Sequence, residues 1–330
     1  MGIPYADEMC AVSVVAGGVE PYVPGNPFLA PKRRPIVVGH RGVPTLHQEN
    51  TLAGFHRAVA LGIPAIELDV RLTADRRAVV LHDNNLERLT GLYRDVDTLT
   101  WDEVSRLRIR RVLPMGIDIN GAPAIVRYDR EERIPLLEEV LAEVANRVAI
   151  NVELKLDGPW WQADVGAVVA NVIAEAGVED RVILTSFDPR KLRAAARLRK
   201  QLAIGFCFDD TMFDLLGPIL ERLPRIPVGL ETHRNARRAL NWLLDGNFAG
   251  RWLGSRVVGA EHTLVGPDTV NRLHRAGVAI GTHTLFPLGT TGKPIAKAAM
   301  TVAEVERLVA LGVDWIESDD PERLLEIVGV

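Results

Sequence analysis

Short β-rich runs alternate with helical patterns along most of this chain, and this alternation restricts the possible folds more than any other feature. Such an order favours a parallel sheet whose strands are joined by crossover helices. The expected strands are Ile36–Gly39, Ala65–Val70, Ala78–Leu81, Val148–Leu154, Val182–Ser186, Ala203–Phe208, Val278–Thr282 and Asp314–Glu317. The expected helices are Leu52–Leu61, Leu136–Asn146, Val165–Ala176, Pro189–Lys200, Pro267–Ala276 and Val302–Leu311.

The position of the polar residues decides between an open sheet and a closed barrel. Nearly every expected strand ends in a polar group, and the chemistry of α/β barrels collects at the C-terminal ends of several strands. We therefore predict an α/β protein with a (β/α)8 TIM barrel. The short spacing from Val70 to Ala78 leaves no room for a crossover helix, so the barrel should be irregular between strands two and three.

Three segments fall outside the repeating pattern. Residues 84–133 have little helical rhythm and are predicted to be an insertion after the third strand. Residues 209–260, rich in Arg and Trp, are predicted to be a connection that caps the barrel mouth. Prolines recur between residues 21 and 35, which predicts an N-terminal extended arm over residues 1–34 and a barrel domain over residues 35–330.

Charge and cysteine content narrow the class of partner. The formal net charge of −4 gives no broad attraction for a polyanion, so no nucleic-acid partner is expected. The two cysteines form no metal-binding or disulfide pattern, which makes a cytoplasmic location the simplest expectation. The apolar run from Cys10 to Val19 follows acidic residues and is too short to cross a bilayer, so we expect no export signal and no membrane span.

The end of the first strand carries residues suited to a phosphate ester. His40 and Arg41 follow the strand, and Glu49, Asn50 and Thr51 open the next helix. A helix N-terminus with exposed N–H groups favours an anion, and Asn50 or Thr51 can cap it. The alternative is an ordinary loop histidine followed by a capped helix.

Two carboxylates share one face of the second strand. Glu67 and Asp69 are two residues apart, so both point to the same side while Leu68 points to the other. Like charges at a barrel mouth call for a cation, and a hard metal with oxygen ligands, Mg²⁺ or Ca²⁺, is the expected cofactor. The alternative is a salt bridge from this pair to Arg41 or Lys155.

Two further strands end in titratable residues. Val79–Leu81 leads to His82, and the strand around residue 152 supplies Glu153 and Lys155 on one face. Buried charges are costly unless they are paired or bind a metal, so this concentration of charge at strand ends favours a functional site over a structural one.

These residues resemble the successive motifs of the glycerophosphodiester phosphodiesterase family. The resemblance extends from about residue 36 to 190, and the C-terminal segment from Gly312 to Pro321 resembles the closing motif of that family. The motifs are His40-Arg41-Gly42, Glu49-Asn50-Thr51, Glu67-Leu68-Asp69-Val70, Thr73-Ala74-Asp75, His82-Asp83, Ile134-Pro135-Leu136-Leu137-Glu138-Glu139-Val140, Glu153-Leu154-Lys155 and Ser186-Phe187.

The resemblance implies a metal-dependent hydrolase that cleaves small glycerophosphodiesters to glycerol 3-phosphate and an alcohol. It implies a metal held by Glu67, Asp69 and Glu153. It further implies that His40 and His82 are the general acid and base, and that Arg41 and Lys155 neutralise the phosphate charge. His283 stands where the family commonly has tryptophan, so we expect it, with Glu49 and Asn50, in the wall of the substrate pocket.

Two other functions remain alternatives. One is a sphingomyelinase D-like or phosphoinositide-cleaving barrel phosphodiesterase; the motif at Glu153–Lys155 and the insertion after His82 argue against it. The other is a catalytically silent barrel that binds phosphorylated ligands, which a missing histidine or metal ligand would have favoured. The side chains of Trp160, Trp161, Trp242 and Trp252 could stack on a choline-like cation, although packing is the commoner role. The sequence does not indicate the alcohol or the oligomeric state.

Overall fold

The fold is a closed barrel of parallel strands, seen here in a computed structural model that describes residues 25–155, 164–209, 212, 240–291 and 294–329. Neighbouring barrel strands pair in the order β1-β2-β6-β7-β8-β9-β10-β11, and β11 pairs with β1 to close the ring. The predicted (β/α)8 TIM barrel is confirmed. The barrel strands are β1 (Ile36–Gly39), β2 (Ala65–Leu72), β6 (Ala149–Leu154), β7 (Val182–Ser186), β8 (Ala203–Phe208), β9 (Val257–Glu261), β10 (Ala279–Leu285) and β11 (Trp315–Ser318).

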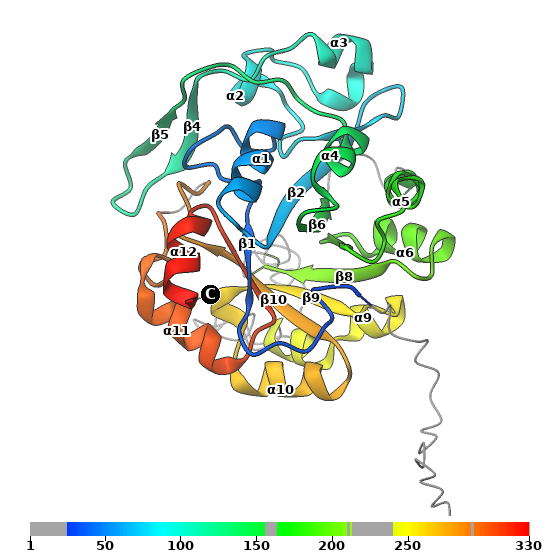
Figure 1. The fold of residues 1–330 in the computed structure, drawn as a ribbon, viewed down its shortest axis with the longest axis vertical. Coiled ribbons are helices and arrows are strands. Elements are labelled where there is room, and N and C mark those ends of the chain that lie inside the picture. The colour runs from blue at the N-terminus through cyan, green and yellow to red at the C-terminus, as the bar shows by residue number, and fades with distance from the viewer. Residues whose placement is uncertain (1–24, 156–163, 210–211, 213–239, 292–293, 330) are drawn as a thin grey trace, which may run out of the picture.

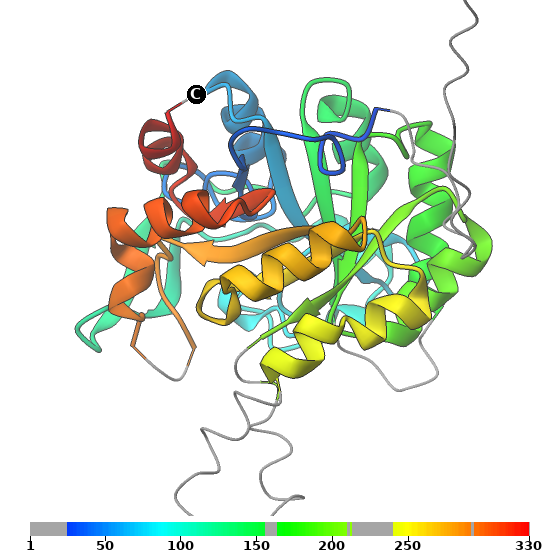
Figure 2. The same cartoon turned by 90° about the horizontal axis from the view of Figure 1, so that it is seen from below.

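Helices cover the outside of the barrel, as Figure 1 and the view from below in Figure 2 show. Helix α1 begins where the Thr51 hydroxyl accepts from the N–H of Gly54, and α12 begins after Asp320, whose carboxylate accepts from Arg323 N. The outer helices are α1 (Leu52–Ala60), α4 (Leu137–Val144), α5 (Val165–Ala176), α6 (Pro189–Leu198), α9 (Phe248–Leu253), α10 (Pro267–Arg275), α11 (Val302–Leu311) and α12 (Pro321–Val328). Short 3₁₀ turns follow β9 and precede α11, at η3 (His262–Leu264) and η4 (Lys297–Met300).

Alternation along each strand separates two apolar layers. Residues such as Ile66, Leu68 and Val152 point outward and join the large core between strands and helices. The inward residues at the N-terminal ends of the strands, among them Ala65, Ala149 and Ile183, are apolar and pack in a separate cluster. That end of the barrel is therefore a packed apolar floor, and the polar inward residues lie toward the C-terminal ends.

Trp315 and Phe28 fill this floor. Their rings meet edge to face with centroids 5.5 Å apart, and both are buried. Gly281 makes room for the indole, since a Cβ at that position would lie 1.7 Å from the Trp315 ring. The predicted extended arm differs here. Residues 25–34 form turns, and Asn26 donates its side-chain N–H to the carbonyl of Val182 at 2.9 Å; residues 1–24 lie outside the described residues.

The assignment of the third barrel strand was wrong. β3 (Ala78–Val80) pairs antiparallel with β2, with Val70 opposite Val80, and lies outside the closed ring. An antiparallel pair needs only a tight turn, which explains the missing crossover helix. The third barrel strand is β6, so the insertion sits within the connection from the second to the third barrel strand.

The predicted insertion is itself folded. It contains α2 (Glu87–Thr90), η1 (Val96–Thr98), α3 (Trp101–Ser105), β4 (Val112–Ile117) and β5 (Pro123–Arg127). These short elements pack around their own apolar cluster, which includes Leu86, Leu89 and Leu113. In Figure 1 the insertion lies above the barrel strands, with the β4–β5 hairpin at one side.

The predicted connection 209–260 was also partly wrong, because it contains the barrel strand β9 and helix α9. The sequence of β9, Val257–Glu261, has a glycine in its centre, which lowers its β-propensity. Residues 210–211 and 213–239 of this segment lie outside the described residues, so the capping role stays a prediction.

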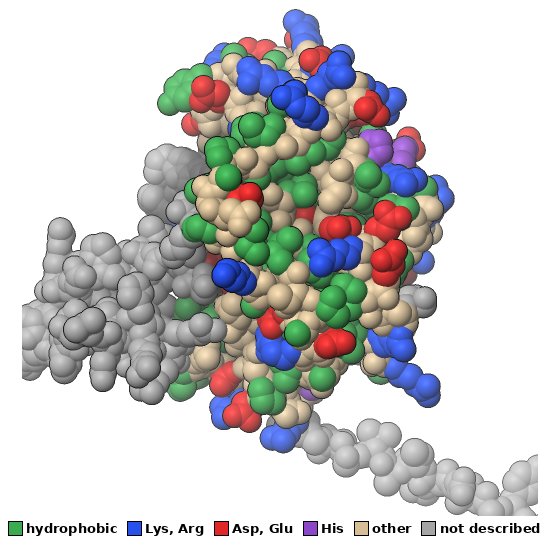
Figure 3. All heavy atoms as spheres, turned by 90° about the vertical axis from the view of Figure 1, so that its left-hand side faces the viewer, with side chains coloured by type: hydrophobic (Ala, Val, Ile, Leu, Met, Phe, Trp, Pro, Cys, Tyr) green, Lys and Arg blue, Asp and Glu red, His purple; other side chains and the backbone are tan. Residues whose placement is uncertain are grey.

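The described surface mixes charges of both signs. Figure 3 shows basic and acidic side chains interspersed with apolar ones over one face of the molecule. None of the helices within the described ranges has the length and apolar character needed to cross a membrane.

Candidate active site

Inward-facing positions at the C-terminal ends of neighbouring strands bring the predicted site residues together. Glu67 and Asp69 occupy alternate positions of β2, and Asp69 lies beside Glu153 of β6 in the strand register. Ligand oxygens of Glu67, Asp69 and Glu153 lie within 4.8 Å of one another. The period of two that fills the barrel floor with apolar side chains thus places three carboxylates at its mouth.

The carboxylate of Glu67 is only partly satisfied. Its Oε2 accepts from the backbone N–H of Arg41 at 2.9 Å, whereas its buried Oε1 has no hydrogen-bond partner among the described residues. Burial, together with the neighbouring charges of Asp69, Glu317 and Glu153, raises its pKa well above the usual range. An all-oxygen cluster with an unsatisfied, electrostatically strained carboxylate fits Mg²⁺ or Ca²⁺.

Arg41 ties the first strand to this cluster. Its Nη1 donates to Glu49 Oε1 at 3.1 Å, and its Nε lies 3.2 Å from Asp69 Oδ2 without being directed at it. Despite its burial, these carboxylates raise the pKa of the guanidinium, so it stays charged. Nε is therefore a buried donor without a hydrogen-bond partner among the described residues.

Glu49 and Asn50 hold other site residues in place. The buried Glu49 carboxylate accepts from both Nη atoms of Arg88 at 2.9 and 2.7 Å, and it also accepts from Arg41. Burial alone would raise its pKa, but the two arginines lower it to about 2. Asn50, at a φ of 58°, donates to Asp69 Oδ2 at 2.8 Å and accepts from Asp69 N at 3.1 Å.

Lys155 neutralises part of the carboxylate cluster. Its Nζ donates to Glu153 Oε1 at 2.7 Å and lies 3.2 Å from Asp69 Oδ1. These two acids raise its pKa against the effect of burial. The buried Lys191 donates to the carbonyl of Lys155 and so holds the lysine backbone; burial lowers the pKa of Lys191 to about 8.

The charges on this side of the mouth do not cancel. Five carboxylates are grouped with three permanently charged cations in the described network, and this surplus of acids agrees with the raised pKa of Glu67. The carboxylates belong to Glu49, Glu67, Asp69, Asp83 and Glu153, and the cations to Arg41, Arg88 and Lys155. A divalent cation would offset this surplus. The alternative predicted from the sequence, a salt bridge from Glu67 and Asp69 to Arg41 or Lys155, is found for Asp69, which lies 3.2 Å from both cations.

Both predicted histidines are paired with an aspartate. His40 Nδ1 lies 2.5 Å from Asp319 Oδ1, and His82 Nδ1 lies 2.7 Å from Asp83 Oδ1. Each carboxylate favours a proton on Nδ1, which directs Nε2 toward other groups; for His40 this atom is 3.9 Å from Glu67 Oε2. Burial, together with Arg41 and Lys155, lowers the pKa of His82, so this imidazole is neutral at neutral pH.

A polar layer separates the mouth from the apolar floor. Asn151 donates to Glu317 Oε1 at 2.8 Å and accepts from the Thr185 hydroxyl at 2.8 Å. Trp315 Nε1 also donates to Glu317 Oε1, at 3.2 Å. Burial raises the pKa of Glu317 to about 7. This layer places a further titratable carboxyl, that of Glu317, between the apolar floor and the cluster of Glu67, Asp69 and Glu153.

His283 comes from β10, whereas His40 follows β1 and His82 follows β3. It occupies an inward position of β10, packs edge to face on Phe187 with centroids 5.9 Å apart, and is close to Asp209 and Glu261. Burial lowers its pKa to about 4. Of the predicted pocket residues, then, Glu49 and Asn50 belong to the charged network and His283 belongs to a different group.

The two described tryptophans that were considered for stacking on the substrate have other partners. Trp242 packs on Phe248, and the ring of Trp252 lies under the guanidinium of Arg193 at 4.3 Å. Trp160 and Trp161 lie outside the described residues.

Sequence reasoning missed several residues that touch the site. Asp319 and Asp83 were noted only as parts of motifs, although an aspartate near each histidine could have suggested an orienting pair. Arg88 gave no such signal, because it lies on the short helix α2 of an insertion with no visible pattern. Asp209 lay at the start of the segment 209–260 that was predicted to be a connection, and Glu261 followed its end.

Residues 40–323 match the family model described as the glycerophosphoryl diester phosphodiesterase family. This range begins directly after β1 and includes the other barrel strands and both sides of the mouth. The chain belongs to the glycerophosphoryl diester phosphodiesterase family. A glycerophosphodiester phosphodiesterase from Caldanaerobacter subterraneus is 28% identical over 294 residues, which cover 89% of this chain and 97% of that protein.

Solved structures of this family share the fold. A glycerophosphodiester phosphodiesterase from Parabacteroides distasonis superposes with a TM-score of 0.61 at 19% identity, covering 89% of this chain and 97% of the other. An Oleispira antarctica phosphodiesterase, solved in complex with the product sn-glycerol-3-phosphate, has a TM-score of 0.62 at 19% identity, covering 90% of this chain and 98% of the other.

Proposed function

We propose that this protein is a divalent-metal-dependent glycerophosphodiester phosphodiesterase that releases glycerol 3-phosphate and an alcohol. The observation that carries the proposal is the set of three carboxylates, Glu67, Asp69 and Glu153, flanked by two histidine–aspartate pairs at the barrel mouth. The sn-glycerol-3-phosphate bound to the Oleispira relative supports a substrate of this class.

The cations of the network bind the phosphate. Arg41 and Lys155 stay charged despite burial because carboxylates surround them, and both lie beside Asp69. Fixed positive charges that need no rearrangement stabilise the extra charge that develops on phosphoryl oxygens in the transition state. Glu49 acts through Arg41, since its carboxylate is occupied by two guanidinium groups.

Glu67, Asp69 and Glu153 hold the metal. A bound Mg²⁺ or Ca²⁺ supplies Lewis-acid polarisation of the phosphoryl group. The chain itself prepares this site: Asn50 fixes both the backbone and the carboxylate of Asp69, and the backbone N–H of Arg41 orients Glu67. Orientation of ligands by such contacts sustains metal affinity.

The two histidines move the protons. The lowered pKa of His82 suits it to accept a proton from the attacking hydroxyl, with Asp83 holding the ring and stabilising the charge that forms. His40 lies between Asp319 and Glu67, an arrangement suited to hold a proton and deliver it to the departing alkoxide. The attacking hydroxyl belongs either to water or to the glycerol moiety, and both routes use these residues.

The test is identification of the product. Glycerophosphocholine, glycerophosphoethanolamine and glycerophosphoinositol are incubated with the protein and each metal, and phosphorus NMR distinguishes glycerol 3-phosphate from a phosphorylated headgroup. We expect glycerol 3-phosphate. Sphingomyelin or lysophosphatidylcholine cleaved in preference to all three substrates would favour the sphingomyelinase D-like alternative, and binding of glycerol 3-phosphate without any turnover would favour a silent barrel.

A further inference from the structure

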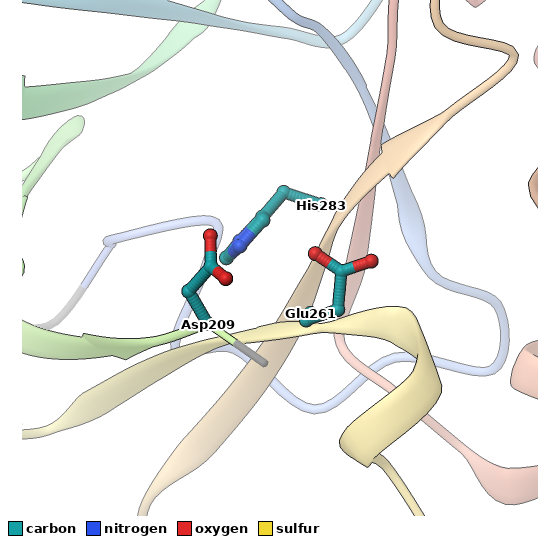
Figure 4. A group of neighbouring side chains, drawn as sticks. All are labelled: Asp209, Glu261 and His283. Carbon is teal, nitrogen blue, oxygen red and sulfur yellow. The ribbon is translucent and has the colours of Figure 1, made fainter. Parts of the chain in front are cut away.

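A second group of potential metal ligands lies at the barrel mouth, apart from Glu67, Asp69 and Glu153. It consists of Asp209, Glu261 and His283, whose ligand atoms lie within 4.8 Å of one another. Figure 4 shows the side chains of Asp209 and His283 pointing toward each other, with the Glu261 carboxylate beside them. The three residues come from the ends of β8, β9 and β10.

The strand register explains why they converge. His283 lies opposite Glu261 in the pairing of β10 with β9, and Phe208 lies opposite Ala260 in the pairing of β8 with β9. Asp209, the next residue, therefore reaches the level of Glu261. In β8 and β10 the inward positions repeat every two residues from Ala203 and Ala279 in the barrel floor, so the chain directs these side chains into the mouth.

The imidazole of His283 provides a second observation that points to a ligand. His283 Nε2 is buried and has no hydrogen-bond partner within the described part of the chain. A buried imidazole nitrogen without a partner is costly, because it gives up its hydrogen bonds to water. A cation bound at this nitrogen would supply the missing partner.

Neighbouring residues contact Glu261 in the way that outer-shell residues contact the ligands of a metal. His262 Nε2 lies 3.6 Å from Glu261 Oε1, and His262 Nδ1 lies 2.7 Å from Glu304 Oε1. Arg307 donates to both oxygens of Glu304 and to the carbonyl of His262. Contacts of this kind help to orient a carboxylate toward a metal.

We propose that Asp209, Glu261 and His283 form a second metal site that takes a divalent transition cation such as Zn²⁺. One imidazole and two carboxylates are a mixed nitrogen and oxygen set, which suits Zn²⁺ or Co²⁺ rather than Mg²⁺ or Ca²⁺. Ligand bonds of about 2.1 Å bring ligand atoms to roughly 3–4 Å from one another, so a small inward movement closes the site. Three protein ligands leave a coordination position for water or for an anionic part of the leaving group.

The test measures binding and does not use turnover, so it stands apart from the proposed phosphodiesterase activity. Co²⁺ is titrated into the full chain in excess Mg²⁺, with visible absorption reporting the ligand field and equilibrium dialysis giving the stoichiometry. We expect one Co²⁺ per chain, displaced by Zn²⁺. Asp209→Asn, Glu261→Gln and His283→Phe should each weaken binding roughly tenfold or more.

Two matched controls separate this site from other metal binding. His56→Gln removes an exposed histidine that lies 3.4 Å from Glu143, and Glu153→Gln removes a ligand of the first cluster; both should keep Co²⁺ affinity within about threefold. The two isosteric carboxylate variants keep the test valid if His283→Phe fails to fold. Absence of saturable Co²⁺ binding, or equal affinity in the parent and in Asp209→Asn and Glu261→Gln, overturns the proposal.

Discussion

The two halves of the barrel mouth differ in how their charged groups are satisfied. On the side of β1, β2 and β6, ion pairs link Arg41, Glu49, Asp69 and Lys155 into a continuous network. On the side of β8, β9 and β10, the buried Nε2 of His283 has no partner among the described residues. The first half also has a buried atom without such a partner, Glu67 Oε1. Ion pairs therefore fix the first half around a position for a metal, and we propose a second metal for the other half.

This difference between the two halves indicates which half carries out phosphoryl transfer and which half selects the alcohol. Rigid charges with fixed partners suit a transition state whose geometry is constant, such as phosphoryl transfer. A half with spare coordinating capacity suits the part of the substrate that varies, the alcohol. The predictions below separate these two roles, from the largest expected effect to the smallest.

Loss of either paired histidine should have the largest effect. His40→Ala and His82→Ala should each lower kcat by roughly a hundredfold or more, since each removes a proton transfer. The double variant should lose less than the product of the single effects, because both act in one step. Steady-state kinetics on glycerophosphocholine measures this, with the exposed His56→Ala as a control that keeps parental kcat. Near-parental kcat in both single variants would assign the acid and base to other groups.

The charged network around Glu49 should also make a large contribution to the free energy of unfolding. Glu49→Gln leaves two buried guanidinium groups without their carboxylate, which should lower the free energy of unfolding at pH 7 by roughly 3–5 kcal/mol. The sign follows from the pKa: Glu49 is lowered from 4.5 to about 2, so its contribution is full above pH 4.5 and disappears as the pH falls toward 2. The difference between parent and variant should therefore shrink at pH 3.

Urea unfolding at the two pH values checks this expectation. Asp102→Asn is the matched control, since it breaks an exposed pair with Arg106 and should cost under about 0.5 kcal/mol. A Glu49→Gln protein as stable as the control would mean that the network does not hold this half of the mouth rigid.

The pH dependence of kcat/KM should follow His82. Its pKa is lowered by burial and by Arg41 and Lys155, so activity should persist below pH 6.5 before the ring is protonated. Arg41→Gln removes a cation and should move the acidic limb to higher pH, whereas Asp83→Asn removes a carboxylate and should move it to lower pH. Arg41→Lys keeps the charge and serves as the control. Shifts in the same direction for Arg41→Gln and Asp83→Asn would refute the assignment.

Changes on the β8–β10 side should redistribute headgroup preference with the smallest effect on the best substrate. His283→Trp fills the space beside Phe187 with an apolar ring and should change the ratio of kcat/KM among choline, ethanolamine and inositol substrates by about two- to tenfold. A uniform loss across headgroups would place His283 in catalysis or folding, and an unchanged profile would place the alcohol pocket elsewhere.

The sequence predicted the barrel and the charged half of the mouth because both depend on local periodicity. Glu67 and Asp69 share a face by their spacing alone, and Glu153 and Lys155 do the same. The ion-pair partners were less visible, since Arg88 reaches Glu49 from a short helix across 39 residues of sequence. Contacts of that kind depend on how an irregular insertion folds, which local patterns do not encode.

The errors have the same origin. Ala78–Val80 has the composition of a buried strand, and composition does not show whether a strand pairs parallel or antiparallel. The strand β9 escaped because Gly259 interrupts an already short run, although the glycine is needed where a Cβ would lie 2.9 Å from Cys207 Sγ. With β9 unrecognised, Glu261 could not be placed beside His283.

The central claim is that Glu67, Asp69 and Glu153 hold a divalent cation on which phosphodiester cleavage depends. The most direct measurement is the rate of glycerol 3-phosphate release by the parent and by Glu153→Gln, after chelation and then across a titration of Mg²⁺ or Ca²⁺. We expect no turnover in chelator, recovery of the parent with added metal, and a Glu153→Gln enzyme that needs roughly tenfold more cation or more for half its maximal rate. Full turnover in chelator, or an identical metal titration for parent and variant, would contradict the claim.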